Sequence, residues 1–226
     1  WMATPPEKRI ALLEKLLEVY QARAEDLAKA MSTEMGAPMD LARTSQVGAG
    51  AWHLSNFIKA AKEFKFEQPL GDHAPNDRII REAVGVAGLI TPWNWPMNQI
   101  TLKVGAAVVA GCTMVLKPSE ESPLDALIFA ELMDEAGFPK GVFSKAAADT
   151  LKKVHLELGG KGANIIFNDA DDKAVKRGVL HMMQNTGQSC NAPSRMLVQS
   201  DVYDKTVEEA GAVASKVTVG PASEDG

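Results

Sequence analysis

A cysteine stands among turn-forming residues in the stretch GQSCNAP, which spans Gly187 to Pro193. Cysteine usually behaves as a small buried hydrophobe, so its place beside glycine, proline and polar side chains suggests that solvent can reach the thiol. Backbone N–H groups close to such a thiol favour the reactive thiolate. Cys190 is therefore a candidate nucleophile, although a structural cysteine that follows a helix explains the segment equally well. The second cysteine, Cys112, lies in the apolar run VVAGCTMVL and is predicted to belong to the core.

Three further motifs place polar side chains next to predicted strands. In TPWNWP, Asn94 lies between two tryptophans and two prolines; a rigidly held amide is a good donor for an oxyanion, although such a loop is more often a packing corner. In KPSE, Lys117 and Glu120 are either ligands of a nucleotide ribose or two solvated charges at a turn. In HLELGG, Glu157 is either an exposed strand-end residue or a general base placed by a tight turn.

Strands and helices alternate from Val84 onward, and this alternation positions the candidate residues. Apolar runs and helical segments follow one another as VGVAGLI, MNQITLKVGAAVVAG, TMVLK, SPLDALIFAELMDEAG, GVF, NIIFND, DDKAVKRGVLHMMQN and RMLVQ. Buried strands that alternate with helices indicate an α/β fold with a Rossmann-type parallel sheet covered by helices on both faces. Ligands of such sheets bind at the carboxyl ends of the strands, where Asn94, Lys117 and Glu157 are predicted to lie.

The chain upstream of this alternation is predicted to be mainly helical. Thr4 and Glu7 have the spacing of a capping box at the start of an amphipathic helix. A second helix covers roughly residues 40 to 62, and the segment FKFEQPLGDHAPNDRIIREA then reads as two short strands around an exposed loop. Further along, Ser122 is the predicted N-cap of the helix that begins near Pro123.

Composition limits the classes of partner and compartment. The 226 residues carry 24 Lys and Arg against 29 Asp and Glu, a net charge of -5 without a basic run, which argues against a nucleic-acid partner. Two cysteines cannot build a disulfide framework, no secretion signal is apparent, and no apolar stretch is long enough to cross a membrane. We therefore expect a cytoplasmic protein. The chain starts at Trp1 and ends in VGPASEDG without a closing element, as a piece of a longer protein would.

The motifs TPWNWP, LKPSE, LELGGK and GQSC, in this order, resemble the aldehyde dehydrogenase superfamily. The resemblance runs from the first helix to RMLVQSDVYD, and LELGGK and the GQSC segment are its most specific parts. It implies a discontinuous NAD-binding domain over residues 1–63 and 84–159. Residues 64–83 would form an oligomerisation β-arm, and residues 160–226 would begin a second α/β domain, the catalytic domain.

The resemblance also implies a mechanism. Cys190 would attack the aldehyde carbonyl to give a thiohemiacetal, whose oxyanion the Asn94 amide and the backbone N–H of Cys190 would hold. Hydride would pass to the nicotinamide and leave a thioester, which water activated by Glu157 would hydrolyse to the acid. Lys103, nine residues after Asn94, resembles a lysine that helps to relay protons.

A nicotinamide cofactor is the implied oxidant. The residues that would contact it are Ile90, Thr91, Pro92, Trp93, Lys117, Ser119, Glu120, Leu158 and Gly159. The Glu120 carboxylate can accept hydrogen bonds from ribose hydroxyls but would repel a 2′-phosphate. We therefore expect NAD to be preferred, with NADP as a possible second cofactor.

The remaining partners follow from the same resemblance. An aldehyde is the expected substrate, and the β-arm implies a homodimer or homotetramer without a nucleic-acid or membrane partner. No metal is expected, because hydride transfer belongs to the nicotinamide and the four histidines show no ligand spacing. These are His53, His73, His155 and His181.

The chain departs from the family at two places, and two rival functions remain open. GVFS runs directly into KAAADTLKK, where a βαβ unit needs about 30 residues or more, so we expect residues with the pyrophosphate turn to be missing between Ser144 and Lys145. The later glutamate–phenylalanine motif of the family is also absent. A cysteine hydrolase or acyltransferase could use Cys190 with His155 or His181 as its base. A non-catalytic or inactive aldehyde-dehydrogenase-like fragment is the second rival.

Overall fold

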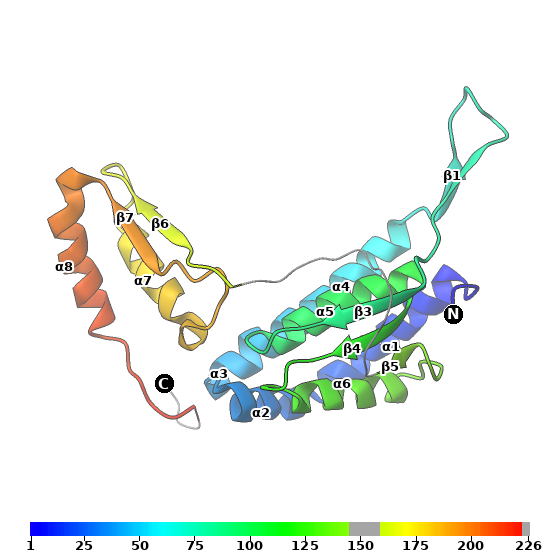
Figure 1. Ribbon diagram of the computed structural model, residues 1–226, viewed down its shortest axis with the longest axis horizontal. Helices are drawn as coiled ribbons and strands as arrows, with labels where there is room; N and C mark the ends of the chain where they lie inside the picture. The colour runs from blue at the N-terminus through cyan, green and yellow to red at the C-terminus, as the bar shows by residue number, and fades with distance from the viewer. Residues whose placement is uncertain (145–158, 223–226) are drawn as a thin grey trace. The chain divides into compact units, whose positions relative to one another are not determined.

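The computed structural model describes residues 1–144 and 159–222 (Figure 1). The chain divides into two compact units, Trp1–Met35 with Ala42–Lys152 and Gly36–Leu41 with Lys153–Gly226. In the described ranges, no helix is long and apolar enough to span a membrane. The predicted division into an NAD-binding domain, an arm and a catalytic domain stays a prediction.

The first unit contains six helices and five strands in its described part. In chain order they are α1 (Pro6–Ala22), α2 (Ala24–Met35), the π-helix η1 (Ala42–Gln46), α4 (Val47–Glu63), β1 (Glu67–Pro69), β2 (Arg78–Ile80), β3 (Val86–Ile90), α5 (Pro96–Ala110), β4 (Thr113–Lys117), α6 (Leu124–Glu135) and β5 (Phe143–Ser144). The single helix expected at the start of the chain is divided at Arg23 into α1 and α2, and the second expected helix contains the π-helix η1 before α4. The other predicted helices and strands of this unit are present in its described part, with small shifts at their ends.

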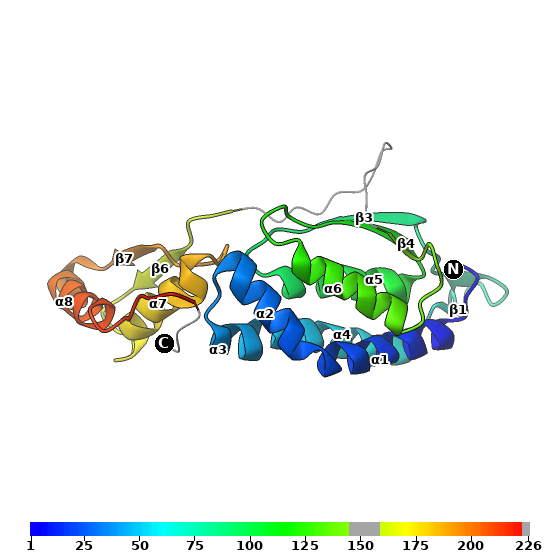
Figure 2. The ribbon, with the colours of Figure 1, turned by 90° about the horizontal axis from the view of Figure 1, so that it is seen from below.

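A parallel sheet of order β3-β4-β5 confirms the predicted α/β fold. Because the order runs in one direction, right-handed crossovers place both connecting helices on the same face. Figure 2 shows α5 and α6 on that face, with α1, α2 and α4 beyond them as a third layer. Leu89, Met114 and Leu116 point into this helical side and are buried, whereas Val86 and Ile90 on the other face are 59% and 73% exposed.

The core of the first unit lies between the two helical layers. Leu13, Leu16 and Tyr20 of α1 are fully buried, and the Tyr20 hydroxyl donates to the carbonyl oxygen of Val47, 2.9 Å away. A Cβ atom at Gly50 would lie 2.1 Å from the Tyr20 hydroxyl, so only glycine fits there.

The capping box predicted for α1 is wrong. Pro5 is the N-cap residue, and no side chain caps the helix. The carbonyl oxygen of Thr4 instead accepts a hydrogen bond of 2.6 Å from the Arg9 guanidinium. Two consecutive prolines fix the entry of the chain into the helix, which removes the geometry that a Thr4 cap requires.

The predicted Ser122 cap of α6 is also wrong, because a carboxylate from α2 takes its place. Glu34 accepts hydrogen bonds from the backbone N–H groups of Leu124 and Asp125, at 2.7 and 3.4 Å. Ser122 donates its hydroxyl to the carboxylates of Glu34 and Asp125. A negative charge at this end of a helix is favourable, and here it also joins two helices.

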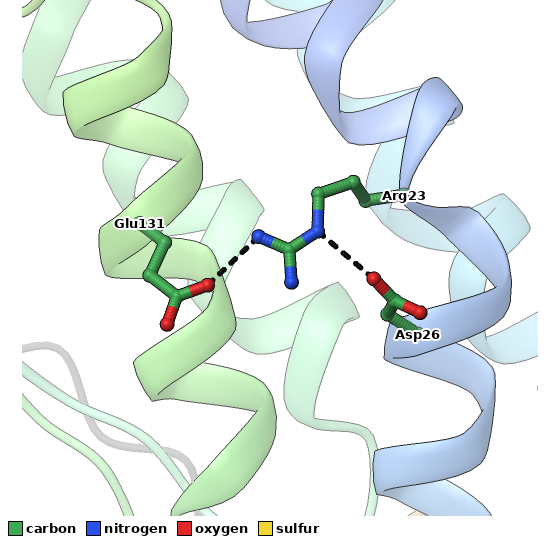
Figure 3. A network of polar contacts seen from close by, with 3 residues as sticks. All are labelled: Arg23, Asp26 and Glu131. Carbon is green, nitrogen blue, oxygen red and sulfur yellow. Dashed lines mark hydrogen bonds and ion pairs between the residues drawn. The ribbon is translucent and has the colours of Figure 1, made fainter.

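A second contact between the same helices lies at the surface. The Arg23 guanidinium, between α1 and α2, donates to Asp26 at 2.9 Å and to Glu131 of α6 at 2.7 Å (Figure 3). All three side chains are partly or largely exposed, so this pair of contacts contributes little to stability.

Asp125 gives the first unit a pH-dependent stability. The pKa of Asp125 is raised to about 7, mainly by burial and also by the nearby Glu34 carboxylate, while the Ser122 hydroxyl opposes the change. Within the described residues, Asp125 Oδ1 has no hydrogen-bond partner. Because the unfolded state releases this proton near pH 4, the free energy of unfolding should fall by up to about 4 kcal/mol between pH 4 and pH 7.

Urea unfolding of the wild type and of Asp125→Asn at several pH values tests this expectation. The variant carries no ionisable group at this position, so its stability relative to the wild type should rise from pH 5 to pH 8. Asp134→Asn, an exposed aspartate on the same helix, is the matched control and should show no such trend. A pH-independent difference for Asp125→Asn would contradict the assignment.

The predicted two-stranded arm is present. β1 and β2 pair antiparallel, with Gln68 opposite Ile79. At the base of the arm, Arg9 lies over the Phe66 ring, 5.3 Å from its centroid, and thereby ties the arm to α1. Leu70 and Ile80 are exposed.

The second unit is a smaller parallel βαβ arrangement. Its elements are α3 (Met39–Leu41), β6 (Ala163–Ile166), α7 (Ala174–Met183), the 3-10 helix η2 (Gln184–Gly187), β7 (Arg195–Val198), the 3-10 helix η3 (Ser200–Val202) and α8 (Tyr203–Ala214). Strands β6 and β7 pair with Ile165 opposite Leu197, and both of these side chains are exposed. Ile166, Val175 and Val179 are buried and form the contact between the strands and α7.

Candidate active site

Two of the predicted loops meet at the carboxyl edge of the first unit's sheet. Ile90, the last residue of β3, lies opposite Lys117, the last residue of β4. The backbone N–H of Thr91 then donates to the Lys117 carbonyl oxygen at 3.2 Å. The structure therefore brings the segments Ile90–Trp93 and Lys117–Glu120 together, at the edge where sheets of this kind bind ligands.

An ion pair stands at this edge. The Lys117 ammonium lies 2.6 Å from a carboxylate oxygen of Glu120, and the two side chains are 49% and 80% exposed. The hydrogen bond from Lys117 lowers the pKa of Glu120. Ser119 accepts the backbone N–H of Glu121 through its hydroxyl. The edge therefore offers a donor and an ionised acceptor to a polar ligand.

The Asn94 loop is held from a distant part of the chain. Asn94 is half-buried just before α5, and its carbonyl oxygen accepts a hydrogen bond of 3.2 Å from the side-chain amide of Gln46. Gln46 is fully buried at the end of η1. Sequence analysis missed Gln46, because its partner lies 48 residues away and no local pattern indicates the contact.

Lys103 lies on α5, two turns beyond the start of the helix. It is half-buried, and its ammonium donates to the side-chain carbonyl of Gln99 at 2.7 Å. The ammonium group of Lys103 is thus held in place on the helix that begins just after Asn94.

Cys190 lies in the second unit, on the loop between η2 and β7, and its side chain is exposed. Cys112 is buried at 3% exposure, as predicted. The Cys190 loop closes with a hydrogen bond from the Ala192 N–H to the Ser189 carbonyl oxygen at 3.0 Å. The second unit therefore presents a reachable thiol on a short, turned loop.

The glycines of the GGKG segment pack against this loop. A Cβ atom at Gly160 would lie 3.5 Å from the Cys190 carbonyl oxygen, and one at Gly162 would lie 3.0 Å from that of Ala192. Arg195 fixes the same segment by donating from its guanidinium to the Lys161 carbonyl oxygen. The close approach explains why glycine occupies position 162.

Of the remaining predicted site residues, one is described by the structure and two are not. Gly159 is exposed at the start of this segment. Glu157 and Leu158 lie outside the described residues, as does His155. In the described ranges, no three His, Cys, Asp or Glu side chains are placed to hold a metal ion.

Comparison with known proteins decides the family. The sequence model of the aldehyde dehydrogenase family matches residues 1–145 and 143–226. The chain belongs to the aldehyde dehydrogenase family. This aldehyde dehydrogenase chain is 43% identical to 3-succinoylsemialdehyde-pyridine dehydrogenase from a Pseudomonas species, over 97% of the chain and 53% of the relative.

Solved structures show the same fold. The aldehyde dehydrogenase from Bartonella henselae is 48% identical with a TM-score of 0.95, over 100% of this chain and 55% of that one. Aldehyde dehydrogenase C from Pseudomonas syringae, solved as a cysteine-to-alanine mutant with NAD+ and octanal, is 38% identical with a TM-score of 0.92, over 98% and 52%. The chain thus spans about half the length of these aldehyde dehydrogenases.

The comparisons also bear on the junction of Ser144 and Lys145. The two matched segments of the family meet at residues 143–145, and the alignment with the Pseudomonas relative covers 257 positions although the chain has 226 residues. The relative therefore has residues within this span that the aldehyde dehydrogenase chain lacks. This agrees with the expectation of missing residues, although Lys145 itself lies outside the described residues.

Proposed function

We propose that the whole protein oxidises an aldehyde to a carboxylic acid, with NAD as oxidant and water as the source of the second oxygen. The observation that carries this proposal is the exposed Cys190 thiol on a loop packed against Gly160 and Gly162, the segment that directly follows Glu157 in the sequence. The candidate base Glu157 therefore precedes, by three residues, a glycine that packs against the loop of the candidate nucleophile Cys190.

The proposed steps begin at the thiol. Cys190 loses its proton, and its Sγ forms a bond to the aldehyde carbon, so that negative charge develops on the carbonyl oxygen. The Asn94 amide and the Cys190 N–H donate to this oxygen, and donors fixed before the reaction stabilise such a charge most effectively. The Gln46 contact serves this purpose, because it fixes the backbone that carries Asn94.

The thioester is then hydrolysed. A bound nicotinamide would supply the hydride acceptor: the hydrogen on the former aldehyde carbon would leave with its bonding electron pair, and an acyl group would remain on Cys190. Glu157 takes a proton from water, the water oxygen attacks the acyl carbon, and the bond between carbon and sulfur breaks to return the thiol. Lys103 would pass protons onward from this region.

The carboxyl edge of the sheet fits the adenosine end of the cofactor. The ionised Glu120 can accept hydrogen bonds from two ribose hydroxyls, and Lys117 can donate to one of them. The backbone of Ile90–Trp93 and the hydroxyl of Ser119 lie along the same edge. Two structurally similar proteins, aldehyde dehydrogenase C and PnpE, were solved in complex with NAD.

The substrate of the whole protein is an aldehyde, and the protein assembles as a homo-oligomer. The name of the Pseudomonas relative, a semialdehyde dehydrogenase, supports an aldehyde as the substrate. A homodimer or homotetramer formed through the arm is supported by two exposed apolar side chains, Leu70 just after β1 and Ile80 at the end of β2.

Cofactor choice provides the test of the proposed function. With a panel of aldehydes, the whole protein should reduce NAD with a higher kcat/KM than NADP, because the Glu120 carboxylate repels a 2′-phosphate. Glu120→Gln removes this charge and should narrow the preference, while Glu121→Gln, an exposed neighbour, is the matched control. Absence of any aldehyde-dependent reduction of either cofactor would overturn the proposal and favour a hydrolase or a non-catalytic protein.

A further inference from the structure

The loop that carries Cys190 is preceded by a left-handed turn. After α7 ends, Asn185, Thr186 and Gly187 have φ angles of 54°, 54° and 75°. Among the described residues, Asn185 and Thr186 are the only non-glycine residues with positive φ. Asparagine and glycine tolerate this region, but a β-branched threonine rarely adopts it. Contacts must therefore hold Thr186 in place.

Gln188 supplies these contacts. Its backbone N–H donates to the Asn185 carbonyl oxygen at 3.1 Å, and its side-chain amide donates to the same oxygen at 3.2 Å. The side-chain amide also donates to the Thr186 hydroxyl, which in turn donates to the Asn185 carbonyl oxygen at 2.7 Å. Three donors thus converge on one oxygen of Asn185, a residue with 2% exposure.

The turn determines where the next residues point. Beyond Gln188, the loop is closed by the Ala192 N–H bond to Ser189 and is bounded by the close approach of Gly162. Within the part of the chain that the structure describes, the backbone N–H groups of Cys190 and Asn191 donate to no protein acceptor. These two donors lie next to the exposed thiol and are available to a developing negative charge.

We propose that Gln188 is a positioning residue for Cys190: its side-chain amide holds the left-handed turn and thereby fixes the unbonded N–H groups beside the thiol. The inference rests on the proposed function, in which the Cys190 thiolate is the nucleophile. Nearby N–H groups favour the thiolate, so the same arrangement that holds the oxyanion raises the reactivity of the thiol.

Alkylation of Cys190 by iodoacetamide, followed by peptide mass spectrometry, tests the proposal without aldehyde or cofactor. Gln188→Met keeps the length of the side chain but removes both donors. The alkylation rate at fixed pH should fall about tenfold, because the loop is then no longer held in one conformation. Gln184→Met, an exposed glutamine just before the turn, is the matched control and should react like the wild type.

A second experiment distinguishes a positioning role of Gln188 from a role in packing alone. Thr186→Gly makes the left-handed conformation accessible without help, because glycine adopts positive φ at no steric cost. In this background, Gln188→Met should slow alkylation by less than about twofold relative to Thr186→Gly alone. A residue that only packs against its neighbours would not be rescued by a glycine two positions away.

The alkylation results test the positioning role of Gln188 separately from aldehyde oxidation. An unchanged alkylation rate in folded Gln188→Met, or a tenfold loss that persists in the Thr186→Gly background, would overturn the positioning role even if aldehyde oxidation is demonstrated. Loss and rescue would support it even if aldehyde oxidation is not found. If Gln188→Met fails to fold, Gln188→Leu, which is uncharged and also has no side-chain donor, takes its place in both backgrounds.

Discussion

Aldehyde oxidation by the whole protein should fall by roughly 10⁴ or more when Cys190 is replaced by alanine. The thiol forms the covalent bond on which both later steps depend, and alanine offers no atom that can replace it. The second cysteine, Cys112, is buried in the core and has no access to an aldehyde. Steady-state formation of NADH is the measurement, and NAD binding by calorimetry should remain within about twofold of the wild type, because Cys190 and the Lys117–Glu120 edge are separate parts of the chain.

Cys112→Ala is the matched control for this loss. It removes the other thiol and should leave turnover close to that of the wild type, although some core packing is lost. Turnover retained in Cys190→Ala would show that the exposed thiol is not the nucleophile. Turnover lost equally in both variants would point to a structural requirement for sulfur instead.

Local sequence patterns predicted the sheet and the position of its carboxyl edge. The apolar side chains of β3 and β4 are buried on the side that faces the helices. A run of apolar residues predicts such a buried strand directly from the sequence. For the same reason, the loops after Ile90 and Lys117 were placed correctly at one edge. The alternation of strands and helices along the sequence was sufficient to predict the position of these two loops.

Contacts between distant segments were not predictable in this way. Ser122 has the residue type and position of an N-cap, but Glu34 reaches the free N–H groups of α6 from another helix. Gln46 likewise holds the backbone of Asn94 through a contact that depends on the packing of η1. A polar side chain that acts across the fold leaves no periodic signal in the sequence.

The turn before Cys190 shows a third kind of limit. The sequence predicted a helix up to the residues MMQN, and α7 in fact ends at Met183. Asn185 and Gly187 are ordinary residues for a left-handed turn, but Thr186 between them argues against one. Only the side chain of Gln188, seen in its folded place, explains how the threonine is accommodated.

The sequence predicted that residues are missing after Ser144, and this prediction came from the minimum length of a crossover connection. β5 ends at Ser144, and a further crossover with a phosphate-binding turn needs more residues than the chain provides before Glu157. In the described sheet, α5 and α6 cover one face, and Ile90 on the other face is largely exposed.

Glu157→Gln should separate the two halves of the proposed reaction. Formation of the thioester requires Cys190, Asn94 and the oxidant but not the base that activates water, so the variant should still produce a first burst of NADH. Hydrolysis should then slow by about 10²–10⁴, the usual contribution of a general base, because the amide of glutamine cannot accept the proton from water. Rapid-mixing kinetics measures the burst, and mass spectrometry of the stopped reaction should find the acyl group on Cys190.

The control for this experiment is a carboxylate that shares neither position nor role. Glu121→Gln removes an exposed charge beside the cofactor edge and should leave both phases as they are in the wild type. A Glu157→Gln variant that binds NAD normally but shows no burst would place Glu157 before acylation, as the base that deprotonates the thiol. A normal burst followed by normal turnover would assign the activation of water to another group, because the neutral amide leaves no base at position 157 to do it.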